Sequence, residues 1–193
     1  FLLSLSLHHE NATIYIMSDS ITKKHIENQT PKLKLDIKWF IELDEYSNKT
    51  RDQLDKENKW TDFQMKKSII ISKTLEIEND VLFLDTDMII TNEINDIDYS
   101  KDLGISPAYI NDTDMKKVGY YNGGMIWVKN KNIPNRWIEL TKESRYYDQA
   151  SIDDLEKEFT NFKFGENYNY QSWRFRLSNE KVEELKKNFI INN

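Results

Sequence analysis

The sequence contains no cysteine, and among its 193 residues there are only three prolines and five glycines. Without cysteine the chain can form neither disulfides nor thiolate metal sites, and no redox compartment can be inferred. A basic excess is also lacking, because 27 basic and 33 acidic residues leave a net charge of −6. The sequence has no run of basic residues that could bind a phosphate backbone, so we expect no nucleic-acid partner.

Long apolar runs are scarce as well. The apolar opening over residues 1–7 is too short to span a bilayer and lacks the basic flank of a signal peptide. We therefore expect no membrane segment in this chain, and a cytoplasmic location is our expectation. A hydrophobic content of 38% suits one domain with a core of its own over residues 1–193, and further domains outside this sequence stay open.

One stretch stands out, in which four apolar residues at 81–84 run directly into Asp85, Thr86 and Asp87. Such a run predicts an interior strand, buried on both faces of a parallel sheet, and ligands bind beyond the carboxyl ends of such strands. Two neighbouring carboxylates are costly to ionise unless a cation lies between them, and oxygen ligands favour Mg²⁺ or Mn²⁺. Alternatively, the two aspartates cap the next segment or face water.

The remaining pattern alternates strands with helices, which predicts an α/β fold with a mostly parallel central sheet flanked by helices. Residues 42–60 show no dominant period and are predicted as a loop with one helical turn at most. We expect helices over about 1–9, 21–28, 61–77, 134–142, 148–159 and 179–188, and strands over 13–17, 33–39, 81–84, 103–106, 125–128 and 162–164.

Other residues are candidates for a site. Lys66 and Lys67 lie one helical turn from apolar residues, so at least one of them borders the buried face. That lysine has two possible roles: its ammonium extends back to solvent, or it is held toward a phosphate. Gly123 and Gly124 come immediately before an apolar strand, as in a plain turn or in a backbone that approaches a ligand closely. The stretch 165–173 is polar and aromatic and suits the lining of a sugar or base pocket, although aromatic residues are more often core.

Together these pieces resemble a GT-A fold glycosyltransferase, and most of all the retaining, family 8-like transferases that use nucleotide-diphospho-sugars. The resemblance covers about residues 60–173, and the front of the chain fits more loosely. The matching pieces follow the family's order: Lys66 or Lys67 on a helix, Asp85-Thr86-Asp87 after a strand, Asn122-Gly123-Gly124, Asp148-Gln149, and Asn169.

The resemblance implies a role for each matching residue. Asp87 would bind Mn²⁺ or Mg²⁺ directly, and Asp85 would contact the metal or the ribose. Asp148 and Gln149 would sit at the reacting carbon as the catalytic pair. The donor, a UDP-sugar by expectation, would contact Lys66 or Lys67, Asp85, Thr86, Asn122, Gly123, Gly124, Asn169 and Trp173, and the acceptor would be a glycan or another hydroxyl compound.

Two departures from the family matter. The late histidine that binds the metal in the family is missing, because the only histidines are His8, His9 and His25. A third protein ligand is therefore unknown or absent. The first strand of a GT-A domain is also absent, and we expect that an N-terminal strand is missing from this sequence.

Two other functions stay open. Haloacid-dehalogenase-type phosphatases also end an apolar strand in Asp-x-Asp, but their motif lies near the chain start and continues with a pair such as Gly-Thr, whereas Met88-Ile89 follow here. Asp153-Asp154 could mimic their later acidic pair but falls inside a predicted helix. The third reading is a sugar-nucleotide-binding module without turnover, which the absent histidine allows.

Overall fold

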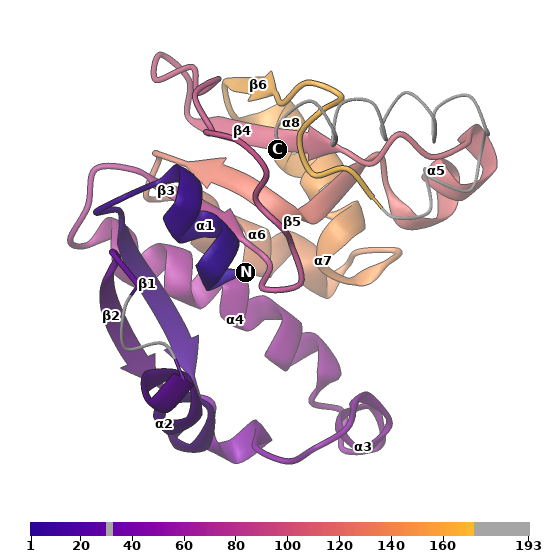
Figure 1. The fold of residues 1–193 in the computed structure, drawn as a ribbon. Helices are drawn as coiled ribbons and strands as arrows, with labels where there is room; N and C mark the ends of the chain where they lie inside the picture. The colour runs from indigo at the N-terminus through magenta and orange to yellow at the C-terminus, as the bar shows by residue number, and fades with distance from the viewer. Residues whose placement is uncertain (30–32, 172–193) are drawn as a thin grey trace, which may run out of the picture.

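The computed structural model describes residues 1–29 and 33–171, which form helices and two small sheets (Figure 1). The predicted mixture of helices and strands is confirmed. The first part of the chain holds a parallel pair of strands, in register from Thr13 opposite Asp36 to Ser18 opposite Ile41. Its elements are α1 (Leu2–His8), β1 (Thr13–Ser18), α2 (Ser20–Gln29) and β2 (Asp36–Ile41).

The second part holds the larger sheet and the helices that pack on it. Its long helix is α4 (Trp60–Leu75), which is preceded by the short helices η1 (Asp44–Tyr46) and α3 (Arg51–Lys56). After it come β3 (Val81–Leu84), β4 (Leu103–Pro107), α5 (Asp112–Val118), β5 (Tyr121–Val128), α6 (Ile133–Lys142), α7 (Tyr147–Ala150), α8 (Ile152–Glu158) and β6 (Asn161–Lys163).

The larger sheet has the order β3-β5-β4-β6 and is mostly antiparallel. Strand β5 runs antiparallel to both of its neighbours, and only β4 and β6 pair in parallel. The prediction of a mostly parallel central sheet is therefore wrong for these four strands. The prediction that residues 81–84 form a strand is confirmed, but the prediction that this strand is interior is wrong, because β3 lies at the sheet's edge.

The packing of β3 explains that error. Val81 and Phe83 pack against a cluster that includes Ile71 of α4, while Leu82 and Leu84 pack against Trp127 on the other face. An unbroken apolar run predicts that both faces of a strand are covered. It does not predict whether both edges of the strand pair with other strands. Both faces of β3 are packed as the sequence predicted, although its four residues are only partly buried, and the prediction about its edge is wrong.

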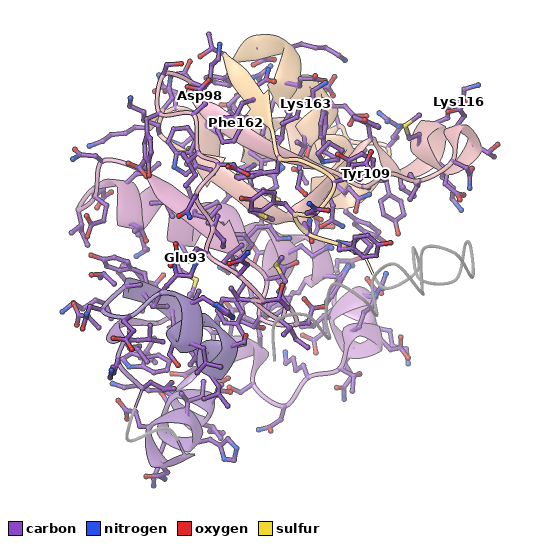
Figure 2. The ribbon with its side chains drawn as sticks, turned by 45° about the horizontal axis from the view of Figure 1, so that its top comes forward. Glu93, Asp98, Tyr109, Lys116, Phe162 and Lys163 are labelled. Carbon is purple, nitrogen blue, oxygen red and sulfur yellow. The ribbon has the colours of Figure 1, made fainter. Side chains whose placement is uncertain are left out.

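The main core lies where α4, α6 and α8 cover one face of the larger sheet. Trp137 of α6 and Leu155 of α8 are fully buried there, together with Ile126 and Val128 of β5. The opposite face carries a smaller cluster, in which the rings of Trp127 and Phe162 lie 5.7 Å apart. Figure 2 shows Phe162 and Lys163 on β6, and Lys116 on the projecting α5.

Several boundaries differ from the predicted ones. Two short helices fill the region expected as a loop at 42–60, the helix expected over 148–159 is divided at Ser151, and β2 begins three residues later than expected. The predicted helix at 179–188 lies outside the described residues. Within the described residues, no helix is both long enough and apolar enough to cross a bilayer.

Candidate functional site

The side-chain ammonium of Lys67 contacts two carboxylates that lie far apart in the sequence. Lys67 on α4 places its Nζ 2.8 Å from Asp148 Oδ2 and 3.8 Å from Asp85 Oδ1. The same Nζ lies 3.4 Å from the carbonyl oxygen of Gly123, to which it donates. The side chains of Lys67 and Asp148 are only 14% and 7% exposed, so solvent screens this ion pair weakly.

Asp85 enters the site because it directly follows β3. Its backbone N–H donates to the carbonyl of Gly124 at 2.8 Å, which continues the β3–β5 ladder by one residue and fixes the start of its side chain. Burial raises the pKa of the Asp85 carboxyl; the ammonium of Lys67 opposes this shift, and the charges of Asp87 and Asp148 add to it. A site that makes a carboxylate costly to ionise favours a bound cation.

Asp148 lies in the first turn of α7, and both of its oxygens are engaged. Oδ2 contacts Lys67, and Oδ1 accepts a hydrogen bond of 3.2 Å from Gln64 Nε2. Its carbonyl accepts a 2.9 Å hydrogen bond from the indole of Trp137, which ties this turn to α6. The N-cap of α7 is Tyr146, and no side chain caps the helix. Asp148 is therefore not the capping residue of α7.

The glycine pair lies inside β5 and not before a strand. The pairing of β4 with β5 shifts register between Ile105 and Ser106, and this irregularity falls where β5 carries Gly123 and Gly124. A Cβ on Gly123 would lie 2.7 Å from Asp148 Oδ2, and one on Gly124 would lie 3.0 Å from Asp85 Oδ2. At Gly124 such a Cβ would also lie 2.8 Å from Asn122 Oδ1. Glycine at both positions avoids these close contacts with neighbouring side chains.

A chain of amides borders the glycines. Asn122 Oδ1 accepts hydrogen bonds from the N–H of Gly124 at 2.8 Å and from Asn169 Nδ2 at 2.9 Å. Asn169 Oδ1 in turn accepts from Gln171 Nε2 at 2.7 Å. The backbone φ of Asn169 is 47°, in the left-handed region that asparagine tolerates better than most residues. These bonds hold the late segment at 165–171 beside β5.

Some predicted site residues are not joined to this cluster. Lys66 pairs with Asp62 at 3.6 Å and lies over the ring of Tyr46, so of the two lysines Lys67 is the one in the site. Thr86 and Asp87 are exposed directly after Asp85. Gln149 is half-buried next to Asp148, and its side chain makes none of the cluster's described hydrogen bonds. Trp173 lies outside the described residues.

Two residues of this cluster, Gln64 and Gln171, were not predicted from the sequence as site residues. Gln64 lies three positions before Lys67 and therefore on the same helical face, so the helical period could have singled it out. Its contact with Asp148 spans 84 positions of sequence. Gln171 lies in the polar and aromatic stretch at 165–173, where no residue spacing distinguishes it.

The residues present fit a divalent cation in part. Asp85 and Asp87 offer oxygen donors of the kind that Mg²⁺ and Mn²⁺ prefer, and the raised pKa of Asp85 marks a place where a cation would relieve like charges. No cluster of three or more histidine, aspartate or glutamate side chains able to hold a metal occurs among the described residues. That Asp85 and Asp87 would hold such an ion stays a prediction.

No model of a known protein family matches the chain, and a search of curated proteins also found no match. What the site does is therefore inferred from its geometry and from the sequence motifs that meet there.

Proposed function

We propose that the chain is a metal-dependent glycosyltransferase. It moves a sugar from a nucleoside diphosphate donor, UDP-sugar by preference, to a hydroxyl group of a glycan or a similar acceptor. The reaction proceeds with retention at the anomeric carbon. The acids Asp85 and Asp87, the glycines of β5 and the pair Asp148-Gln149 form the donor site.

One observation carries this proposal: Lys67 links Asp85 and Asp148 across the glycine pair of β5. Sequence motifs 63 positions apart thereby meet in one site, in the combination that the resemblance implies for nucleotide-sugar transfer. The absence of side chains at Gly123 and Gly124 lets the carboxylates of Asp148 and Asp85 lie against the backbone of β5.

The charges of the site suit the departure of a diphosphate. When the sugar–phosphate bond breaks, negative charge gathers on the leaving diphosphate, and a bound divalent ion supplies Lewis-acid stabilisation there. Lys67 contributes a fixed positive charge without any proton transfer. The sugar becomes oxocarbenium-like in the same step, and the carboxylate of Asp148 offsets that positive charge.

The surroundings of Asp148 favour retention over inversion. Inverting transfer requires a general base that takes the proton of the attacking hydroxyl. Both oxygens of Asp148 are already engaged, one by Lys67 and the other by Gln64, so neither is turned toward an attacking hydroxyl alone. Its role is instead to orient the donor sugar, with Gln149 next to it near the reacting carbon.

A thermal-shift panel followed by a turnover assay tests the function. UDP, UDP-glucose, UDP-galactose and UDP-N-acetylglucosamine are each added with Mn²⁺, and a ligand that binds the native state raises the apparent stability. We expect stabilisation by at least one UDP-sugar and release of UDP from it. The variant Asp87→Asn should abolish both effects.

The alternatives give different results in the same assays. Release of phosphate from a simple phosphomonoester with Mg²⁺, without any response to nucleotide sugars, would identify a phosphatase. Metal-dependent nucleotide binding with no donor hydrolysis would identify a binding module. Product analysis by NMR decides the stereochemistry, and an anomer opposite to the donor's would make Asp148 the leading candidate for a general base.

A further inference from the structure

The ammonium group of Lys67 is surrounded by oxygen atoms, as a bound metal ion would be. Among the described residues its oxygen neighbours are Asp148 Oδ2 at 2.8 Å, the carbonyl oxygen of Gly123 at 3.4 Å and Asp85 Oδ1 at 3.8 Å. An ammonium has three N–H donors and no acceptor, so it can only attract such oxygens. Lys67 therefore supplies positive charge at the place where the carboxylates of the candidate site come together.

The groups around Lys67 leave this charge little freedom to move away. Gln64 Nε2 donates to the other oxygen of Asp148 at 3.2 Å, which holds that carboxylate from its second side. Asp85 Oδ2 lies so close to the backbone of β5 that a Cβ on Gly124 would be only 3.0 Å from it. The positive charge is thus fixed beside both carboxylates.

A divalent ion held by Asp85 would have this ammonium as a near neighbour of like charge. Asp85 Oδ1, one of the two oxygens that the residue offers to an ion, already lies 3.8 Å from Lys67 Nζ. Like charges at such distances disfavour one another. The side chain of Lys67 is only 14% exposed, so solvent screens the repulsion weakly. The ammonium and a divalent ion therefore compete for the same carboxylate.

We propose that Lys67 is a tethered cation that opposes binding of the metal alone, so that the site takes a divalent ion only together with a diphosphate. This inference rests on the proposed function. The negative charge of a diphosphate attracts both the ion and the ammonium and offsets their mutual repulsion. Lys67 thereby determines specificity: the metal binds with a nucleoside diphosphate, and it binds weakly alone or with a nucleoside monophosphate, which offers the ion fewer phosphate oxygens.

Removal of the charge on Lys67 should therefore strengthen the binding of metal alone. Asp148 and Asp85 would then be neighbouring carboxylates without a compensating charge, and a bound cation would relieve them without help from a nucleotide. A lysine with a purely structural role gives the opposite expectation, because its loss would loosen the two carboxylates and weaken the metal site. The direction of the change in metal affinity thus separates the two roles.

The test measures the dissociation constant of Mn²⁺ for the full chain, from the electron paramagnetic resonance signal of the free ion. Mn²⁺ is titrated alone, with UMP and with UDP. The test variant is Lys67→Gln, because a glutamine amide can still donate to Asp148 while it removes the charge. The matched control is Lys66→Gln, because Lys66 pairs with the exposed Asp62 at 3.6 Å and lies outside the site.

In the wild type, we expect UDP to lower the dissociation constant of Mn²⁺ by about 100-fold and UMP to lower it by less than about tenfold. In Lys67→Gln, the dissociation constant of Mn²⁺ alone should fall by about tenfold or more, and the effect of UDP should shrink by the same factor. Lys66→Gln should match the wild type in all three titrations. By linkage, Mn²⁺ should raise the affinity for UDP by the factor by which UDP raises the affinity for Mn²⁺.

Equally tight binding of Mn²⁺ with and without UDP would overturn the inference, and this titration uses the wild-type chain alone. An unchanged or weaker affinity for Mn²⁺ in Lys67→Gln would assign the lysine a structural role and would also overturn it. So would equal gains in Lys66→Gln and Lys67→Gln, which would reflect net charge alone. Failure of the proposed function gives a different result, in which neither UDP nor any UDP-sugar binds the wild-type chain at any Mn²⁺ concentration.

Discussion

Lys66 and Lys67 are neighbours in sequence and identical in chemistry, yet their partners differ. The ammonium of Lys67 pairs with the buried carboxylate of Asp148 and lies 3.8 Å from that of Asp85, which is 41% exposed. Lys66 pairs with Asp62, whose side chain is 63% exposed. The free energy of an ion pair depends on what remains when one partner is removed. A buried carboxylate left without its cation is costly, whereas an exposed one is solvated.

Replacing each lysine by methionine separates these two settings. Lys67→Met should lower the free energy of unfolding by about 3 kcal/mol, because Asp148 then stays buried without a compensating charge. Lys66→Met, the matched control, should change it by less than about 0.5 kcal/mol. Denaturant unfolding at constant pH measures both values. Equal effects of the two substitutions would contradict the assignment of Lys67 to the site.

Gly123 offers a second test at this scale. Gly123→Ala should lower the free energy of unfolding by about 1–3 kcal/mol, since the new methyl group would lie 2.7 Å from Asp148 Oδ2, and Lys67 and Gln64 hold that carboxylate in place. Turnover of a responsive UDP-sugar should fall as well. Gly165→Ala is the control, because no atom lies within 4 Å of the added carbon there and its effect should stay within about 0.5 kcal/mol. A neutral Gly123→Ala would show that Asp148 is free to move.

The elements differ in how far their sequence determines them. Helix α2 begins at Ser20, one residue before its predicted start, and Asp19 Oδ1 accepts from the N–H groups of Ile21 and Thr22 in its first turn. Helix α3 was missed, although Thr50 and Gln53 form a reciprocal capping box at its start. A short charged helix has too few apolar positions to show a period, so its only sequence signal is the cap.

Substitution of the capping residue of α2 should have a pH-dependent effect. Hydrogen bonds from the hydroxyl and the N–H of Thr22 lower the pKa of Asp19. A lowered pKa means that its contribution is fully present above the ordinary value and is lost as the pH falls through the lowered one. Asp19→Ala should therefore cost about 1 kcal/mol at pH 7 and progressively less in acid. Asp19→Asn retains an acceptor and should cost less at pH 7; urea unfolding at several pH values compares the variants.

For the whole molecule, the sequence predicted the mixed helix and strand content and the position of most elements. It did not predict how the strands pair. The hydrophobic pattern describes one segment at a time, whereas pairing depends on two segments together. The same limit applied to the site. The sequence identified Asp85, Gly123 and Asp148 separately, while the contact from Gln64 depended on tertiary packing across 84 positions.

The stability of the whole molecule should respond to metal and nucleotide together. With Mn²⁺ and UDP at 100 times the dissociation constant, binding to the native state should add about 2.7 kcal/mol to the free energy of unfolding. Asp87→Asn should remove most of this gain and cut turnover far more than it changes the stability of the metal-free protein. Asp98→Asn is the control, as Asp98 is an exposed carboxylate bonded only locally, to Ser100. An undiminished thermal shift in Asp87→Asn would remove this residue from the metal site.

The long sequence separation between Gln64 and Asp148 also has a consequence for synthesis. A ribosome that adds about 5–20 residues per second needs several seconds to make the 84 positions between them. In the later part of that time α4 and Asp85 have been made, while Asp148, whose Oδ2 lies 2.8 Å from Lys67 Nζ in the folded chain, has not. If the site binds a nucleotide-sugar as proposed, a nascent chain arrested before residue 148 should fail to retain nucleotide at any metal concentration.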